Sequence, residues 1–346
     1  MHRYFKSDNT APVAPEILAA IVAANEGFAP GYGDDEWSRR LDARFGELFE
    51  REVRVFPVAT GTAANTLALA TLVPPYGAIL VHEEGHIVRD ECGAPEFMTG
   101  GARLLLLPGP QAKLTPQAIA SCLAAHPTSV HTVQPRALSL TQATELGTVY
   151  TPDEVAAVAN LAHRRGLAVH MDGARFANAL AYLDCSPAEV TWRAGVDVLS
   201  FGATKNGALT AEAVIFFDPA RAADFEFRRK RSGHLLSKMR FVAAQLLAYL
   251  EDDLWLRLAA RANELARRVG AAASAMLLQP VEANEVFVSL GDQRIAALRA
   301  QGFEFYDWGA EAAGQARFVV SWNQTTFDVE ALCAALVALQ AESRGS

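Results

Sequence analysis

Short apolar runs recur through the first two thirds of the chain, and helix-like amphipathic segments separate them. The runs lack the alternation of polar and apolar residues that marks a half-exposed strand, so we expect strands buried on both faces. The predicted strands are Val53–Val58, Ala78–His82, Arg103–Leu107, Ser129–Val133, Leu167–Met171, Val196–Ser200 and Ala213–Phe217. Their alternation with helices predicts an α/β fold with a seven-stranded, mostly parallel sheet between helices.

The clearest helix signal begins at Thr151. Thr151 and Glu154 have the spacing of a capping box, Pro152 occupies the first turn and Gly166 follows the last one, which predicts a helix from Pro152 to Arg165. The other predicted helices are Ala14–Glu26, Trp37–Phe49 with Asp34 or Asp35 as its N-cap, Ala63–Leu72, and a long helix from Leu235 to about Val269.

The last hundred residues follow a different order of elements, which is typical of a small α+β domain with an antiparallel sheet. We therefore expect a large domain over residues 1–245, including an N-terminal segment, and a small domain over residues 246–346. The predicted elements of the small domain are the strand Glu285–Leu290, the helix Asp292–Gln301, the strands Phe303–Trp308 and Arg317–Trp322, and the helix Asp328–Glu342.

Composition narrows the class of protein. The chain has 346 residues, 51% of them hydrophobic and 20% charged, and a net charge of −8, which disfavours nucleic acid or an anionic membrane as the main partner. No apolar run reaches membrane length, and the N-terminus lacks the apolar core of a signal peptide. The cysteines are scattered without metal-ligand spacing, so we expect reduced thiols in a cytoplasmic protein. They are Cys92, Cys122, Cys185 and Cys333.

Lys205 is the first candidate for chemistry. It follows a predicted strand in the small-residue segment SFGATKNG and has little in the local sequence to pair with. Desolvation there favours the neutral amine, which can attack a carbonyl and form a Schiff base. A solvated loop lysine is the alternative interpretation.

Two further strand ends carry candidate binding groups. Gly61 and Thr62 lie where a strand ends and a helix begins, so their backbone amides can cradle a phosphate, although a plain helix cap has the same pattern. Asp172, in LAVHMDGAR, ends a buried strand with Arg175 three residues later. The alternative here is an aspartate that caps the next turn and pairs with that arginine.

Taken together, these groups predict a pyridoxal phosphate (PLP) enzyme. Such an enzyme needs a lysine for the aldehyde, a carboxylate on the pyridine nitrogen, a helix N-terminus for the phosphate and a ring against the cofactor face. Gly61, Asp172 and Lys205 occur in that chain order, each beside a predicted strand end.

At the level of whole segments, the chain resembles the low-specificity L-threonine aldolase family, which are fold-type I PLP lyases with the aspartate aminotransferase fold. The resemblance runs in order over almost the whole chain. It rests on SDNT (Ser7–Thr10), GYGDD (Gly31–Asp35), TGTAAN from Thr60, HIVRDECGAPEF (His86–Phe97), HMDGARFANA (His170–Ala179) and SFGATKNG from Ser200.

The resemblance implies roles for the cofactor-binding positions. Lys205 matches the Schiff-base lysine and Asp172 the partner of the pyridine nitrogen. Gly61 and Thr62, with the neighbouring Ala63, match the phosphate site, and His86 matches the imidazole that stacks on the cofactor and lies near the substrate β-hydroxyl.

The resemblance also implies substrate contacts. Arg175, Arg317 and Ser7 match the groups that hold the substrate α-carboxylate, a task that suits the two-pronged guanidinium. In the basic run Phe225–Arg240, Lys230 and Arg240 are the candidates to approach the phosphate, from this chain or a neighbouring subunit, and a solvated face is the alternative.

One segment departs from the family pattern. Where many members have a histidine, the segment Leu138–Gly147 has Thr144. The base for the substrate hydroxyl therefore stays open among His86, Glu91, Asp90 and a water on the phosphate. His82 and His86 are four residues apart, but that spacing in a strand-to-loop segment does not indicate a metal, and we predict none.

The implied reaction is retro-aldol cleavage of L-threonine, L-allo-threonine and related L-β-hydroxy-α-amino acids to glycine and an aldehyde, in a homotetramer built from dimers. The alternatives are a phenylserine aldolase, a β-eliminating PLP lyase, or a PLP-fold protein that binds a small ligand to regulate a partner. A Rossmann oxidoreductase is disfavoured because no GxGxxG follows an early strand.

Overall fold

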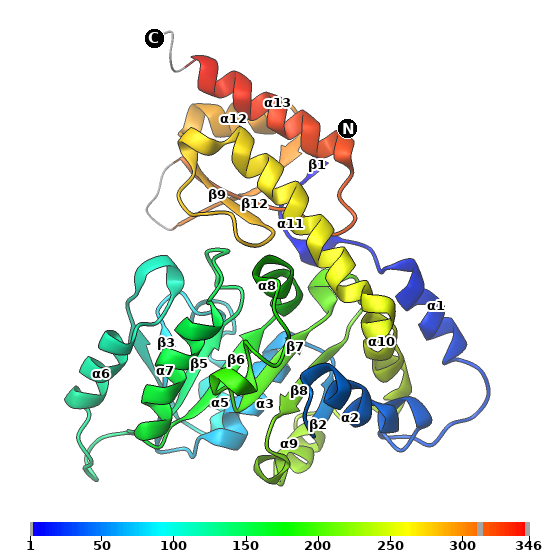
Figure 1. Ribbon diagram of the computed structural model, residues 1–346, viewed down its shortest axis with the longest axis vertical. Coiled ribbons are helices and arrows are strands. Elements are labelled where there is room, and N and C mark those ends of the chain that lie inside the picture. The colour runs from blue at the N-terminus through cyan, green and yellow to red at the C-terminus, as the bar shows by residue number, and fades with distance from the viewer. Residues whose placement is uncertain (1–2, 310–313, 343–346) are drawn as a thin grey trace.

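The central sheet has seven strands, as the apolar runs predicted. The computed structural model describes residues 3–309 and 314–342 (Figure 1). The strands are β2 (Arg54–Val58), β3 (Gly77–His82), β4 (Arg103–Leu107), β5 (Gln134–Thr141), β6 (Ala168–Gly173), β7 (Val198–Gly202) and β8 (Glu212–Phe216). Their order is β2-β8-β7-β6-β5-β3-β4, and only β8 runs antiparallel to its neighbours, so the predicted α/β class with a mostly parallel sheet is confirmed.

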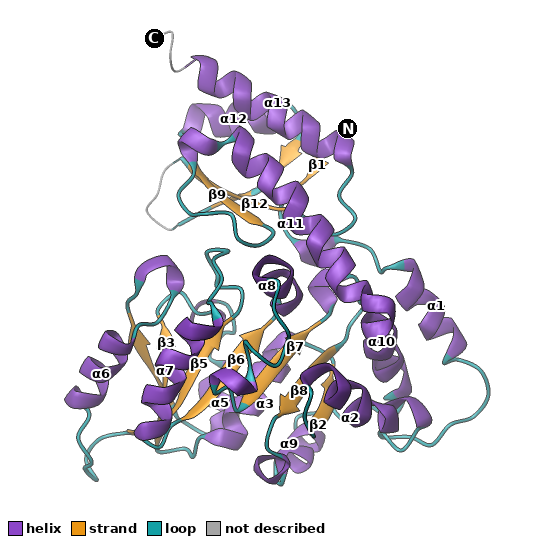
Figure 2. Cartoon of the chain, in the orientation of Figure 1, coloured by secondary structure: helices purple, strands orange, loops and turns teal. Residues whose placement is uncertain are grey.

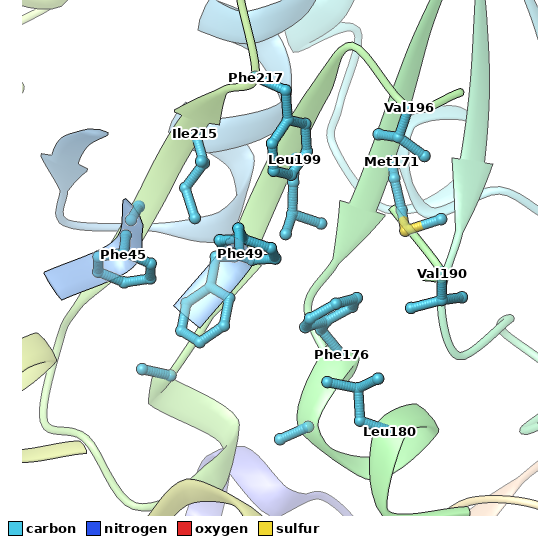
Figure 3. Close-up of a cluster of buried hydrophobic side chains, with 14 of the residues drawn as sticks. Phe45, Phe49, Met171, Phe176, Leu180, Val190, Val196, Leu199, Ile215 and Phe217 are labelled. Atoms are coloured by element: carbon cyan, nitrogen blue, oxygen red, sulfur yellow. The ribbon is translucent and has the colours of Figure 1, made fainter. Parts of the chain in front are cut away.

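Helices cover both faces of this sheet (Figure 2). Successive strand residues point to opposite faces, so Leu199 of β7 joins one buried cluster and Val198 joins another. The first cluster packs Phe45 and Phe49 against the sheet (Figure 3), and the second contains Leu67. The helices in this part of the chain are α1 (Pro15–Ala23), α2 (Glu36–Phe49), α3 (Gly61–Leu72), α4 (His86–Arg89), α5 (Ala94–Thr99), α6 (Pro116–Ala125), α7 (Pro152–Arg164), α8 (Phe176–Leu183), α9 (Phe225–Arg231) and α10 (Arg240–Leu250).

The cap residues lie where the sequence predicted them. Thr151 and Glu154 form the complete capping box of α7, and Asp35 caps α2 by accepting a hydrogen bond from the amide of Ser38. Helix α3 begins at Gly61, two residues before the predicted start, because Thr60 accepts a hydrogen bond from the amide of Ala63 and acts as the N-cap.

Strand β5 corrects one prediction. The segment predicted as Ser129–Val133 is a turn in which Val130 is 97% exposed, and the strand lies at Gln134–Thr141 instead. The apolar stretch from Ala137 to Leu140 is buried between β3 and β6, whereas the earlier segment has no strand on either side to satisfy its backbone.

The predicted long helix is also wrong, because it is broken into α10 and α11 (Leu254–Ala272). Asp252 and Asp253 take left-handed backbone conformations, with φ of 47° and 53°, and interrupt the helical backbone between α10 and α11. The carbonyl of Leu250 at the end of α10 accepts a hydrogen bond from Arg44 of α2, which satisfies a group that the broken helix leaves unpaired.

A smaller sheet has its own core. It is built from β9 (Glu285–Ser289), β11 (Tyr306–Asp307) and β12 (Gln315–Val319) in the antiparallel order β11-β12-β9, flanked by α12 (Asp292–Ala300) and α13 (Thr326–Glu342). The predicted strand Phe303–Trp308 is two short strands, β10 (Phe303–Glu304) and β11, and β10 pairs with β1 (Arg3–Tyr4) from the start of the chain.

The N-terminal segment therefore packs on the smaller sheet, where Phe5 belongs to the same buried cluster as Leu265 and Leu339. Helix α11 contacts α8 at one end and α13 at the other, which joins the two cores (Figure 1). The division of the chain at residue 245 stays a prediction. No helix in the described part of the chain is long and apolar enough to cross a membrane.

Candidate active site

A cavity of about 410 Å³ opens at the carboxyl ends of β5, β6 and β7, beside the N-terminus of α3. Ligands in open α/β sheets lie at this edge because the loops that follow parallel strands converge there. The polar side chains that line the cavity belong to Asn9, Thr60, Thr62, Asn65, His86, Thr141, Glu145, Asp172, Arg175, Thr204, Lys205, Thr210 and Glu212.

Lys205 lies in a short 3₁₀ turn that directly follows β7. The turn is fixed by Asn206, whose side-chain amide donates to the hydroxyl of Tyr249 (2.6 Å) and to the carbonyl of Trp255 (2.8 Å). The Lys205 amine makes no hydrogen bond or ion pair with any residue that the structure describes. It is half-buried and stays available to a ligand in the cavity.

The surroundings of Lys205 are more acidic than its sequence neighbours suggested. Its charge acts on the carboxyl groups of Glu212, seven residues later on β8, and of Asp8, which comes from the start of the chain. Burial raises the pKa of Glu212 to about 7, although Lys205 opposes the shift.

Asp172 is the last side chain of β6 before its terminal glycine, and it is buried. Its Oδ2 accepts a hydrogen bond from Asn65 Nδ2 (2.7 Å), and its Oδ1 accepts one from the amide of Ala174 (3.0 Å). The carboxylate thus caps the following turn, as one interpretation of the sequence held, but it does not pair with Arg175. Held by α3 and its own loop, it lines the cavity.

Asn65 was missed by the sequence analysis although it joins two acidic groups. The same Nδ2 that bonds Asp172 also lies 3.0 Å from Glu91 Oε1. Asn65 is one helical turn after Gly61 on α3, so the two residues lie on the same face of the helix. That spacing is the feature of the sequence that could have placed Asn65 at the site. Its Oδ1 is buried and has no hydrogen-bond partner in the described chain.

His86 begins α4 and is held at two points. Its Nδ1 lies 2.8 Å from Glu91 Oε1, and its backbone amide donates to Glu145 Oε1 (2.7 Å). The hydrogen bond to Glu91 raises the pKa of His86, with a further contribution from the charge of Asp172. Burial raises the pKa of Glu91 itself.

His86, Glu91 and Asp172 place potential metal-ligand atoms within 4.8 Å of one another. Those atoms are engaged in the hydrogen bonds that join His86 to Glu91 and both carboxylates to Asn65. The prediction that the site uses no metal stays a prediction.

The N-terminus of α3 offers backbone donors. The first amides of a helix have no partner within it, and Gly61 and Thr62 line the cavity. A Cβ added at Gly61 would meet nothing within 4 Å, so there is room for a ligand beside it. Ala63, by contrast, donates its amide to Thr60 Oγ1 and does not line the cavity, so Gly61 and Thr62 keep the open donors.

The two predicted arginines share one carboxylate. Arg175 Nη1 lies 3.4 Å from Glu285 Oε2, and Arg317 Nη1 lies 3.6 Å from Glu285 Oε1. Arg175 also pairs with Asp8 through Nε (2.8 Å) and Nη2 (3.0 Å). The Arg317 guanidinium lies over the rings of Tyr306 and Trp308. The structure thus brings together two arginines that are far apart in sequence, although only Arg175 lines the cavity.

The other predicted residues lie outside the cavity of this chain. The hydroxyl of Ser7 caps a 3₁₀ turn by accepting from the amide of Asn9, and it is Asn9 that lines the cavity. The Lys230 amine lies over the ring of Tyr32 (4.3 Å), and Arg240 donates to the carbonyl of Gly27. Lys230 and Arg240 therefore do not reach the α3 N-terminus of their own chain.

Thr144 does not line the cavity, whereas its neighbour Glu145 does. The hydroxyl of Thr144 is buried and bonds Thr148 Oγ1 (2.8 Å). Glu145 lines the cavity, and its Oε1 accepts from the amide of His86 and from Thr141 Oγ1 (2.9 Å). Glu145 was not among the residues predicted from the sequence. Two features of the sequence could have indicated it. Glu145 follows a parallel strand, and it lies in the segment Leu138–Gly147, where this chain differs from the family pattern.

Comparison with known proteins places the chain in a family. Residues 4–293 match the family model described as beta-eliminating lyase. A low-specificity L-threonine aldolase of Pseudomonas aeruginosa is 48% identical over 323 residues, which cover 92% of each chain, and one from another Pseudomonas strain is 44% identical over 95% of this chain and 96% of the relative.

Solved structures agree with that placement. A threonine aldolase of Leishmania major has a TM-score of 0.90 at 28% identity and covers 98% of this chain and 99% of its own. The serine palmitoyltransferase of Sphingomonas wittichii, with a TM-score of 0.74 at 16% identity over 99% of this chain and 88% of its own, shares the fold. The chain therefore belongs to the beta-eliminating lyase family, within the group of low-specificity L-threonine aldolases.

Proposed function

We propose that this protein is a PLP-dependent L-threonine aldolase. It cleaves L-threonine, L-allo-threonine and related L-β-hydroxy-α-amino acids to glycine and an aldehyde. The observation that carries the proposal is the unpaired Lys205 amine in one cavity with the Asp172 carboxylate, the His86 ring and the N-terminus of α3. The 44–48% identity to proteins named for this activity supports it.

The cavity suits PLP in size and in its donors. About 410 Å³ lies within the usual range of small-molecule sites, roughly 300–1,000 Å³. Lys205 supplies an amine for the aldehyde, Asp172 a carboxylate for the ring nitrogen, and Gly61 and Thr62 amides for the phosphate. When bound, PLP forms a Schiff base with an amine and draws electrons away from the substrate Cα.

The protein's own groups orient the reaction. Asp172 is fixed by Asn65 and the Ala174 amide, so it keeps a ring nitrogen protonated without moving. His86 is fixed by Glu91 and assigned to the face of the ring, beside the substrate hydroxyl. The substrate α-carboxylate is assigned to Arg175, Arg317 and Ser7, and Ser7 precedes Asp8, which pairs with Arg175. Holding the carboxylate fixes the orientation of the substrate and so selects the bond that breaks.

Product analysis tests the proposal. The purified holoenzyme is incubated with L-threonine, L-allo-threonine and L-phenylserine, and glycine and the released aldehyde are measured for each. Acetaldehyde and glycine in equal amounts are expected from the first two. A preference for benzaldehyde release would make the protein a phenylserine aldolase. 2-Oxobutanoate and ammonia from either threonine isomer, or phenylpyruvate and ammonia from phenylserine, would instead indicate β-elimination, the second candidate, which the description of the matching family model favours.

We further propose that the protein is a cytoplasmic homotetramer. The exposed Phe97 and Phe227 line a groove of about 1030 Å³ that also contains Thr62 and Ala63 at the start of α3. A second copy on this groove would bring other side chains to the phosphate end of the site, and Lys230 and Arg240 are the candidates. Light scattering measures the assembly directly. The cytoplasmic location rests on the four free cysteines.

A further inference from the structure

Glu145 has an unused oxygen. Among the described residues, three acidic side chains line the cavity, and they are Asp172, Glu212 and Glu145. Both oxygens of Asp172 accept hydrogen bonds, and Glu212 accepts from the turn that carries Lys205. Glu145 uses only Oε1. Its Oε2 is buried and has no hydrogen-bond partner in the described chain.

The position of this carboxyl group is fixed by its other oxygen. Oε1 accepts from the amide of His86 (2.7 Å) and from the hydroxyl of Thr141 (2.9 Å). Thr141 is the last residue of β5 and is the register partner of Asp172 on β6. Glu145 is therefore anchored between His86 and the strand position next to Asp172. Because Oε1 already accepts two hydrogen bonds, Oε2 is the oxygen that remains to take up a proton.

The electrostatic surroundings favour proton exchange near neutral pH. Burial, and then the charge of Asp172, raise the pKa of Glu145 to about 7. Four titratable residues from the surrounding elements interact with Glu145. They are Asp172 on β6, His86 on α4 (through its backbone amide), Arg175 before α8, and Tyr150 in the loop between Glu145 and α7. A group that titrates near the working pH can both take and return a proton.

We propose that Glu145 is the general base that takes the β-hydroxyl proton of the substrate. The inference rests on the proposed aldolase function. The hydroxyl proton moves to Glu145 Oε2, and the O–H electron pair becomes the second bond of the aldehyde carbonyl. The Cα–Cβ pair stays on Cα, which takes up a proton to give glycine. Glu145 then releases its proton before the next turnover.

The other candidate bases are less suited. His86 Nδ1 is bonded to Glu91, and Glu91 Oε1 is shared between that ring and Asn65. Neither Glu91 nor Asp90 lines the cavity. His86 Nε2, which has no hydrogen-bond partner in the described chain, and a water on the phosphate are the remaining competitors, and Glu145→Gln removes neither.

The test compares Glu145→Gln with wild-type holoenzyme in two reactions. Glutamine keeps an acceptor for the His86 amide and Thr141 but cannot take a proton. Threonine cleavage should fall about 100- to 10,000-fold in kcat, the usual contribution of a general base. Exchange of the glycine α-proton, a reaction without a β-hydroxyl, should be largely retained. The exposed Glu83→Gln is the matched control and should leave both reactions unchanged.

A direct titration supplies a readout independent of activity. Infrared difference spectra of the cofactor-free protein should show a buried protonated carboxyl band that disappears with a midpoint near pH 7. Glu212, whose pKa burial also raises to about 7, contributes a band in the same range, so the Glu145 band is the part that is lost in Glu145→Gln and kept in Glu212→Gln. In wild-type holoenzyme, kcat/KM for threonine should fall as pH drops below about 7, because the base is then protonated, and this limb should be missing from glycine exchange.

Three results would overturn the assignment: threonine cleavage at wild-type rate in Glu145→Gln, equal loss of cleavage and exchange, or no carboxyl band near pH 7. If Glu145→Gln fails to fold, the infrared titration is made on Glu212→Gln, where the remaining band near pH 7 belongs to Glu145. The wild-type comparison of cleavage with exchange needs no variant. Failure of the proposed function itself has a different signature, which is the absence of glycine and aldehyde from the wild-type protein.

Discussion

The Arg175 guanidinium and the Asp8 carboxylate form a two-point ion pair, with Nε 2.8 Å from Oδ2 and Nη2 3.0 Å from Oδ1. The pair joins the loop after β6 to the N-terminal segment that packs on the smaller sheet, so it connects both parts of the molecule at the cavity. It also sets the direction of a guanidinium that is assigned to the substrate carboxylate.

Asp8→Asn should destabilise the fold by roughly 3 kcal/mol at pH 7, because Arg175 is then left buried with one weaker partner, Glu285. Urea unfolding measures the change. Glu330→Gln, which breaks the exposed pair with Arg268, should cost less than about 1 kcal/mol. Wild-type stability in Asp8→Asn would contradict the role given to the pair.

The same pair predicts a pH dependence. Although burial opposes the shift, the charges of Arg175 and Lys205 lower the pKa of Asp8 below its ordinary 3.8 in the folded protein. Its contribution is therefore complete above that value and is lost as the pH falls below it. The stability difference between wild type and Asp8→Asn should narrow in that acid range. A difference that stays constant there would be inconsistent with this titration.

Asn65→Ala should weaken cofactor binding and lower stability by about 1–3 kcal/mol, since one substitution removes the donor shared by Asp172 and Glu91. Cofactor release during dialysis and urea unfolding are the measurements. Gln117→Ala on the surface of α6, which loses only a bond to Ser121, is the control and should change neither. Normal cofactor retention in Asn65→Ala would show that Asp172 needs no support from α3.

Lys205→Ala should abolish both aldol turnover and the visible absorbance that PLP acquires when bound to a lysine, because no other described amine lines the cavity. Absorbance spectra and aldehyde release are measured together. Lys113→Ala, which breaks an ion pair with Glu154, should keep both. Full turnover in Lys205→Ala would remove this residue from the chemistry.

Arg317→Ala should raise KM for threonine about 10- to 100-fold and lower kcat, as expected for the loss of a charged hydrogen bond of about 1.5–3 kcal/mol. Arg317→Lys keeps the charge but not the two-pronged geometry, so it should recover only part of the loss. Steady-state kinetics separates the two parameters. Unchanged values in Arg317→Ala would limit this arginine to its contacts with Glu285 and Trp308.

Much of the architecture could be predicted from local sequence. The capping box at Thr151 was recognisable because both partners are within four residues, and the buried strands because their apolar runs have no polar alternation. Lys205, Asp172 and Gly61 were recognisable because each lies at or just after the end of a strand, and the fold places these strand ends at one edge of the sheet. The strand at Ser129–Val133 and the long helix were wrong because those patterns depended on neighbours that only folding supplies.

By itself, then, the sequence determined the α/β class, the parallel sheet, the strand-end candidates and the family resemblance, since these depend on periodicity and on motifs within short segments. Only the tertiary structure decided the partners: Asn65 reaches Asp172 across 107 residues, Arg175 reaches Asp8 across 167, and Glu145 meets the amide of His86 across 59. Hydrogen bonds and ion pairs require side chains within about 3 Å, and chain folding alone brings such distant residues together.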